Sequence, residues 1–127
     1  MNLIVCDRSS LISTWDVIMS NSQVRSRSIW MMFLNSQGKT ARQIGIVSDI
    51  PQFPTNAFAS EIASGAREIV SGIFCGSVAL LATRPDAQRV SHLDQDWANC
   101  LTGAMNRWGV NYWPVAILAG GEIVVLD

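Results

Sequence analysis

The chain has 127 residues, of which 49% are hydrophobic and 15% are charged, so it has enough apolar material for one folded core. Nine basic and ten acidic residues give a net charge of −1, which provides no electrostatic reason to expect nucleic acid as a partner. So low a net charge instead permits self-association. We expect one domain spanning residues 1–127.

We expect neither a signal peptide nor a membrane-spanning segment. The first residues lack a basic stretch, and no apolar run approaches the length of about 18 residues that a membrane span needs. Cys6, Cys75 and Cys100 form an odd set without metal-ligand spacing. Because their sequence neighbours are apolar, we expect three buried thiols in a reducing compartment and hence a cytoplasmic protein.

The first half of the chain predicts a helix followed by a hairpin. In residues 9–20 the apolar side chains fall on one helical face, which predicts a helix that is buried on one side. The continuous apolar run at 29–34 indicates a buried strand. A turn ending in Gly38 leads to a second strand over 39–47. The two prolines in 49–55 predict a loop.

The second half predicts helices and strands in alternation. Apolar residues at helical spacing predict a helix over 57–72, and a buried strand follows at 77–82. After a polar loop, a third helix begins near Ser91 and ends at Gly109. Strands at 115–118 and 123–126 are joined by a Gly-Gly turn. This order predicts an α/β fold, in which helices pack on a mixed β-sheet.

Five segments, taken together in their order and spacing, resemble the RadC-type branch of the JAMM/MPN metalloprotease superfamily. They are Phe33–Lys39, Arg67–Val70, Ser77–Ala82, Ser91–Asp94 and Trp113–Leu126. The resemblance covers residues 25–127 and implies a cytidine-deaminase-like α/β sandwich. Residues 1–24 lie outside it as an N-terminal helical extension.

The resemblance also implies where a zinc site would lie. The family holds zinc with a His-x-His-Pro turn, a later Ser-x-x-Asp and a Glu on the second strand, and the metal activates a water for hydrolysis. Here Ala82 and Arg84 stand where the two histidines are expected, and Ile44 stands at the glutamate position. Asp94 of the Ser91–Asp94 motif is retained. One carboxylate cannot hold catalytic zinc, so we expect neither a metal nor another cofactor.

Two other interpretations of the same segment remain open. A rearranged metal site would use His92, Asp94 and a third donor such as Asp86. Alternatively, Ser91 and Asp94 need no metal at all, because a Ser at the N-cap and a carboxylate at N3 are the usual residues of a helix start.

Three functional hypotheses follow. The first is a pseudoenzyme: a non-catalytic RadC/MPN-like domain that acts as an interaction or assembly module and forms a homodimer or binds another protein, with no nucleic-acid or membrane partner. The second is a small-anion site built from Arg84, Arg89 and the helix N-terminus at Ser91. The third is a metal-independent hydrolase, in which the hydroxyls of Thr83 or Ser91 would need the single histidine, His92, as a base.

Overall fold

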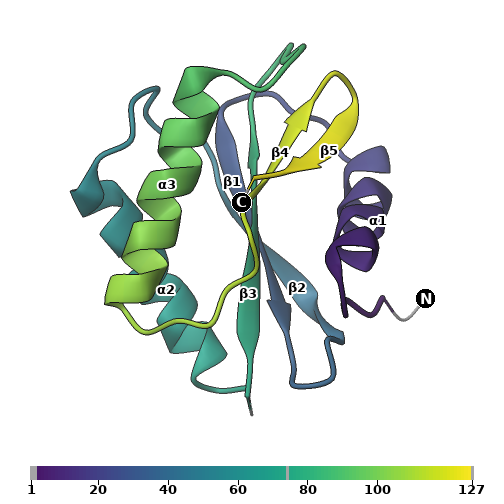
Figure 1. Cartoon of the computed structure of the whole chain (residues 1–127), viewed down its shortest axis with the longest axis vertical. Coiled ribbons are helices and arrows are strands. Elements are labelled where there is room, and N and C mark those ends of the chain that lie inside the picture. The colour runs from purple at the N-terminus through teal and green to yellow at the C-terminus, as the bar shows by residue number, and fades with distance from the viewer. Residues whose placement is uncertain (1–2, 74, 127) are drawn as a thin grey trace.

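The computed structural model describes residues 3–73 and 75–126, except for the side chains of residues 42 and 43. Its elements follow the predicted order of helix, hairpin, helix, strand, helix, hairpin (Figure 1). Their bounds are α1 Arg8–Ser20, β1 Ser28–Leu34, β2 Thr40–Val47, α2 Asn56–Val70, β3 Ser77–Thr83, α3 His92–Arg107, β4 Ala116–Ala119 and β5 Glu122–Val125. The predicted α/β class with a mixed sheet is confirmed.

The five strands form one sheet in the order β2-β1-β3-β4-β5. β1 is antiparallel to both β2 and β3, β3 and β4 are parallel, and β4 and β5 form an antiparallel hairpin. Gly120 and Gly121 join this last hairpin with positive φ angles, as the Gly-Gly turn predicts. β1 and β3 are buried along nearly their whole length because helices cover both faces of the sheet (Figure 1).

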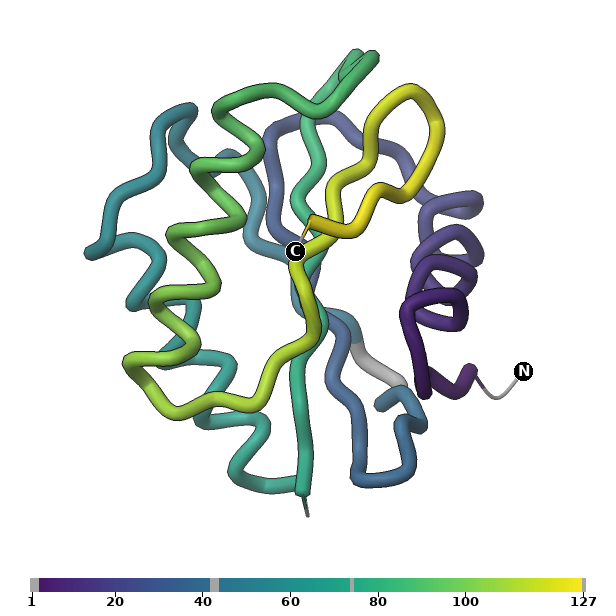
Figure 2. The backbone as a smooth tube through the Cα atoms, in the orientation of Figure 1, coloured from purple at the N-terminus to yellow at the C-terminus, as the bar shows by residue number. Residues whose placement is uncertain are grey.

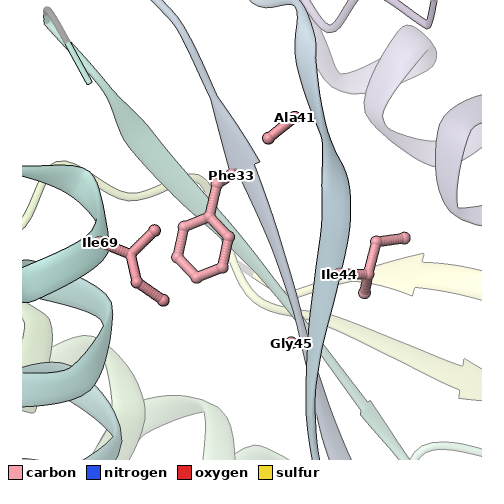
Figure 3. Close-up of a pocket in the computed structure, with 5 residues that line it drawn as sticks. All are labelled: Phe33, Ala41, Ile44, Gly45 and Ile69. Atoms are coloured by element: carbon pink, nitrogen blue, oxygen red, sulfur yellow. The ribbon is translucent and has the colours of Figure 1, made fainter. Parts of the chain in front are cut away.

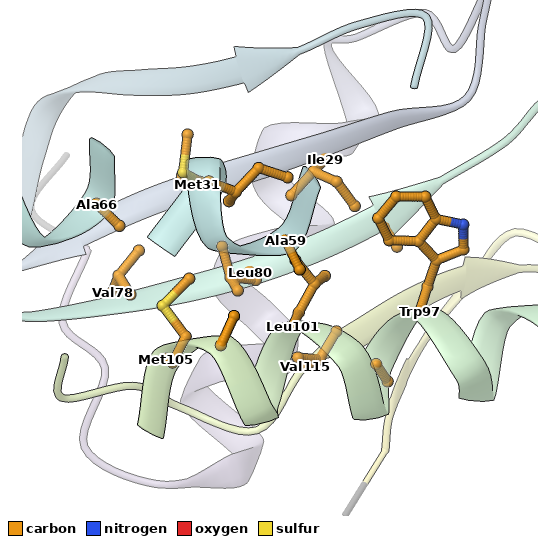
Figure 4. Packing of buried hydrophobic residues seen from close by; sticks show 14 of the residues in the cluster. Ile29, Met31, Ala59, Ala66, Val78, Leu80, Trp97, Leu101, Met105 and Val115 are labelled. Atoms are coloured by element: carbon orange, nitrogen blue, oxygen red, sulfur yellow. The ribbon is translucent and has the colours of Figure 1, made fainter. Parts of the chain in front are cut away.

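Helices α2 and α3 cover one face of the sheet, and α1 covers the other (Figure 1). The larger core lies under α2 and α3, where Leu80 and Met31 of the sheet meet Leu101 and Ala59 of the helices (Figure 4). The smaller core lies under α1, where Leu11 and Trp15 pack on the opposite side of the same strands. The predicted apolar face of the N-terminal helix is therefore buried, and that helix completes the second layer.

The chain before α1 also pairs with the sheet. Ile4 forms an antiparallel bridge with Lys39, and the Val5 N–H donates to the Gly38 carbonyl at 2.8 Å. Figure 2 shows this purple segment reaching the hairpin end of β1 and β2. Gly38 has a φ of +77°, and a Cβ there would lie 1.9 Å from the Val5 carbonyl oxygen, so only glycine fits. Residues 38–40 are thus covered on the outer side of β2.

The prediction of three buried cysteines is wrong. Cys6 and Cys75 are exposed, and Cys100 is half-buried. Cys6 lies just before the N-cap of α1, and Cys75 occupies a turn with a φ of +51°. Both thiols belong to connections at the surface, where the burial of apolar sequence neighbours does not extend to them.

Within the part of the chain that the structure describes, no helix has the length and apolarity needed to cross a membrane.

A buried hydrogen bond ties the end of β3 to β1. The Trp30 indole Nε1–H donates to the Thr83 hydroxyl at 2.9 Å, and Thr83 is only 2% exposed. We expect Thr83→Val to lower the free energy of unfolding by about 1–3 kcal/mol, because it leaves the indole N–H buried without an acceptor. Urea denaturation checks this. Thr83→Ser keeps the acceptor and is the control, so equal losses in both variants would contradict the assignment.

Candidate functional site

The connection between β3 and α3 contains the residues at which the resemblance would place a zinc site. It leaves the sheet after Thr83 and turns at Asp86, whose φ is +57°. It then runs beside the β4–β5 turn, where the Gly120 N–H donates to the Ala87 carbonyl at 2.9 Å (Figure 2). Ser91 ends it as the N-cap of α3. This path brings the chain back across the end of β3 and places Asp94 beside Arg84.

Arg84 and Asp94 form a two-pronged ion pair. The guanidinium Nε of Arg84 donates to Oδ1 of Asp94 at 3.1 Å, and its Nη2 donates to Oδ2 at 3.0 Å. The same Nη2 also donates to the backbone carbonyl of Arg89 at 2.8 Å, which holds the loop against the pair. The Asp94 side chain is 4% exposed and that of Arg84 is 22% exposed. Such paired, nearly parallel hydrogen bonds are the strong form of an arginine–carboxylate contact.

Asp94 also completes the start of α3. Its Oδ2 accepts the Ser91 backbone N–H at 2.8 Å, and its own N–H donates to the Ser91 hydroxyl at 3.1 Å. This reciprocal pair is a capping box, so the structural interpretation of the Ser91–Asp94 motif is confirmed. One buried carboxylate therefore accepts hydrogen bonds from both the guanidinium and the helix start.

These contacts set the ionisation of the pair. Burial raises the pKa of Asp94, but hydrogen bonds from Arg84 and from the Ser91 backbone outweigh it and hold that pKa below its ordinary value of 3.8. The hydrogen bond to Asp94 in turn raises the pKa of Arg84. Both groups are therefore charged across the whole neutral range, and the pair is internally neutral.

The structure brings together only some of the residues at the expected zinc-site positions. Arg84, Ser91 and Asp94 meet, and Ala82 lies just before them with its side chain in the core under α2 and α3. Ile44 does not join them, because its side chain packs on the α1 side of the sheet. In Figure 3 it points away from Phe33 and Ile69, which lie on the α2 side.

The β2 residue level with Ala82 is Val47 and not Ile44. Ile29 of β1 pairs with Val47 on one side and with Ala82 on the other, so the three lie in one row on the same face. The pairing of β1 with β2 is irregular between Met32 and Leu34, which shifts the register. Nothing in the sequence alone marks this shift. The Val47 side chain has no donor atom for a metal.

The described residues offer no set of metal donors. Over residues 3–73 and 75–126, no group of three His, Cys, Asp or Glu side chains is placed to hold an ion. The alternative set of His92, Asp94 and Asp86 does not assemble, because His92 and Asp86 are exposed while Asp94 is buried on Arg84. The permanently charged guanidinium of Arg84 is bound to the Asp94 carboxylate.

The arrangement gives little support to an anion site at this helix start. Nε and Nη2 of Arg84 already donate to Asp94, and Nη2 also donates to the Arg89 carbonyl. The Ser91 backbone N–H donates to the same carboxylate. Arg89 is exposed, and an anion that used Nε or Nη2 of Arg84 would have to displace Asp94 from a neutral pair.

Neither hydroxyl of the hydrolase hypothesis is hydrogen-bonded to His92 in the described part of the chain. The Thr83 hydroxyl is buried and accepts the Trp30 indole N–H, and the Ser91 hydroxyl accepts the Asp94 backbone N–H. His92, the only histidine, is exposed at the first turn of α3. The three residues do not form the hydrogen-bonded nucleophile and base that such chemistry uses.

A second candidate surface lies along β2 and α2. Unlike the polar Arg84–Asp94 pair, it is apolar and exposed. β2 is an edge strand, and Ile46 on it is 49% exposed while Ile69 on the neighbouring α2 is 48% exposed. Two hollows of about 230 and 260 Å³ follow the line between β2 and α2. Figure 3 shows the first, with Phe33 and Ile69 facing each other beside Gly45. We call residues 41–47, with Glu61, Gly65 and Ile69 of α2, the β2 edge surface.

The comparisons with known proteins identify no relative for this chain. It matches no protein-family model, and it has no significant match among curated proteins.

Proposed function

We propose that this chain is a non-catalytic domain of the RadC/MPN-like type and a cytoplasmic assembly module that self-associates. The observation that carries the proposal is the Arg84–Asp94 pair, in which a guanidinium neutralises the carboxylate that a metal would need. The order of helices and strands agrees with the RadC-like sandwich that the sequence resembles. The fold is thus retained while the metal donors are replaced by residues of a structural ion pair.

The exposed apolar surface supports an interaction role. Ile46, on the α1 side of β2, and Ile69, on α2, are both about half exposed beside the strand edge. No described segment pairs with the outer backbone groups of residues 41–47. A net charge of −1 opposes association only weakly. Two-fold dimers are the commonest way in which a soluble chain covers such a surface.

Sedimentation velocity tests the proposal on the intact chain. We expect the sedimentation coefficient to rise from that of a monomer to that of a dimer between low and high micromolar concentration. A coefficient that stays at the monomer value up to several hundred micromolar would contradict self-association. Addition of zinc should leave both the coefficient and the transition unchanged, because the ion pair and not a metal completes the β3–α3 connection.

A further inference from the structure

We infer that the self-association surface is the free edge of β2, which pairs antiparallel with β2 of a second copy about a two-fold axis at Gly45. This inference rests on the proposed self-association and specifies its geometry. The two sheets would then join into one continuous sheet across the dimer. The occupant is a second copy of this chain, and the reasons lie in the pairing, the charges and the area of the β2 edge surface.

The edge already accepts a strand in this orientation. Ile4 bridges Lys39 in antiparallel fashion, and the Thr40 N–H donates to the Leu3 carbonyl at 3.2 Å. Beyond this point, no described segment pairs with the outer side of residues 41–47. Their outward N–H and C=O groups are therefore available for a second strand.

A two-fold axis at Gly45 places apolar side chains of the two copies opposite each other. In an antiparallel ladder centred there, Ile44 of one copy lies opposite Ile46 of the other, and this apolar pair occurs twice. Both side chains lie on the α1 side, because they oppose Met32 and Trp30 of that face. Ile46 is 49% exposed in the single chain and would be covered. A centre one residue away, at Ile46, would instead place Ile44 opposite Ser48 and lose the repeated apolar pair.

On the α2 side of β2, the surface is hollowed where the two copies would approach each other. Gly45 has no side chain, and Gly65 of α2 has no neighbour within 4 Å of a Cβ position. Glu61, Gly65 and Ile69 succeed one another at one-turn spacing along the outer edge of α2 and line the two hollows. The two α2 helices can therefore approach across the axis without a bulky residue at its centre.

The charges along the strand are complementary in this pairing. Lys39 immediately precedes β2, and Asp49 lies two residues after its end. The two-fold places position 49 of one copy opposite position 41 of the other, two residues from Lys39. The basic start of each strand thus lies beside the acidic end of its partner. A parallel arrangement would bring like charges together.

The available area is close to that of a standard interface. A free stretch of seven residues is about 24 Å long, and a sheet with a helix on each face is about 30 Å thick, which gives about 700 Å² per copy. Standard stable interfaces take about 800 Å² from each partner. The single chain exposes 7078 Å², so about one tenth of its surface would be buried.

The first test is Ile46→Lys, examined by sedimentation alongside Phe53→Lys. Ile46 and Phe53 are both large exposed apolar residues, at 49% and 66%, so neither change disturbs the core. Ile46→Lys should weaken dimerisation at least a hundredfold, because the lysine would face an isoleucine. Phe53 lies outside the β2 edge surface, and its variant should dimerise as the unmodified chain does. Circular dichroism verifies that both variants are folded.

The second test locates the axis by disulfide cross-linking. The background is Cys6→Ser and Cys75→Ser, because both native thiols are exposed. In the dimer the two Gly45 Cα atoms lie about 5 Å apart, within disulfide range, whereas the two Ala41 Cα atoms lie about 27 Å apart. Gly45→Cys should therefore cross-link under mild oxidation at least tenfold faster than Ala41→Cys. A Cβ at Gly45 would come tightly close only to the flexible end of Met31, at 3.1 Å, since its contacts with Met31 Cβ and the Phe33 ring lie at 3.6 and 3.8 Å.

The outcomes separate the two proposals. If the unmodified chain stays monomeric at every concentration, the proposed self-association fails and the edge interface fails with it. If the unmodified chain and Ile46→Lys are both dimers, self-association stands and the β2 edge is the wrong surface. If Ile46→Lys is monomeric but Ala41→Cys cross-links as fast as Gly45→Cys, the axis at Gly45 is wrong.

Discussion

Asp94→Ala should lower the free energy of unfolding by about 3 kcal/mol, the low end of what is typical when one partner of a buried ion pair is removed. The low end applies because the Arg84 side chain is 22% exposed and water can still reach it. The same change removes the capping-box acceptor for the Ser91 N–H. Thermal denaturation should show a decrease of about 12 °C for a domain of this size.

Matched variants make this result specific. Asp96→Ala removes an exposed carboxylate from the same turn of α3, and it should change stability by less than about 0.5 kcal/mol. Arg84→Ala together with Asp94→Ala completes a double-mutant cycle, for which we expect a coupling energy of about 1–3 kcal/mol. Coupling near zero, or equal losses for Asp94→Ala and Asp96→Ala, would show that the ion pair does not hold the connection.

The stability that Asp94 contributes should depend on acid pH. The pKa of Asp94 is held below 3.8 in the folded chain, so the unfolded chain takes up its proton first as the pH falls. The contribution is therefore fully present above about pH 5, and it is lost as the pH falls through the folded pKa. Asp94→Asn lacks this titration, so its stability deficit relative to the unmodified chain should be largest near neutrality and should shrink below pH 4.

Urea denaturation of both proteins between pH 7 and pH 2 measures this difference. Asp7, whose pKa is also lowered by the Ser10 backbone N–H, is present in both proteins and cancels in the comparison. A deficit that stays constant down to pH 2 would mean that Asp94 is not the ionised partner of Arg84.

The elements of the fold could be predicted because the apolar pattern is consistent along the chain. The continuous apolar run of β1 predicts a strand, and the apolar stripe of α3 predicts a helix. The observed bounds of both elements lie within about two residues of the predicted ones. Ser91 and Asp94 could be recognised as a helix start for the same local reason. These inferences need only neighbours in sequence.

What could not be predicted depends on contacts between distant segments. Arg84 reaches Asp94 because the chain turns back at Asp86, and no local pattern specifies that path. Continued regular pairing from Leu34 and Thr40 would place Ile44 opposite Trp30, but the irregular register places it opposite Met32. The burial of the cysteines failed as a prediction because apolar neighbours in sequence do not bury a residue that lies on a surface turn.

The most direct test of the central claim is a zinc titration of the purified chain by isothermal calorimetry at neutral pH, with metal analysis of the protein beforehand. If Arg84 occupies the carboxylate of Asp94, the protein should contain no stoichiometric zinc and should show no saturable binding at micromolar concentration. One zinc ion bound per chain, and lost in Asp94→Asn, would contradict the account and would point back to metal-dependent hydrolysis.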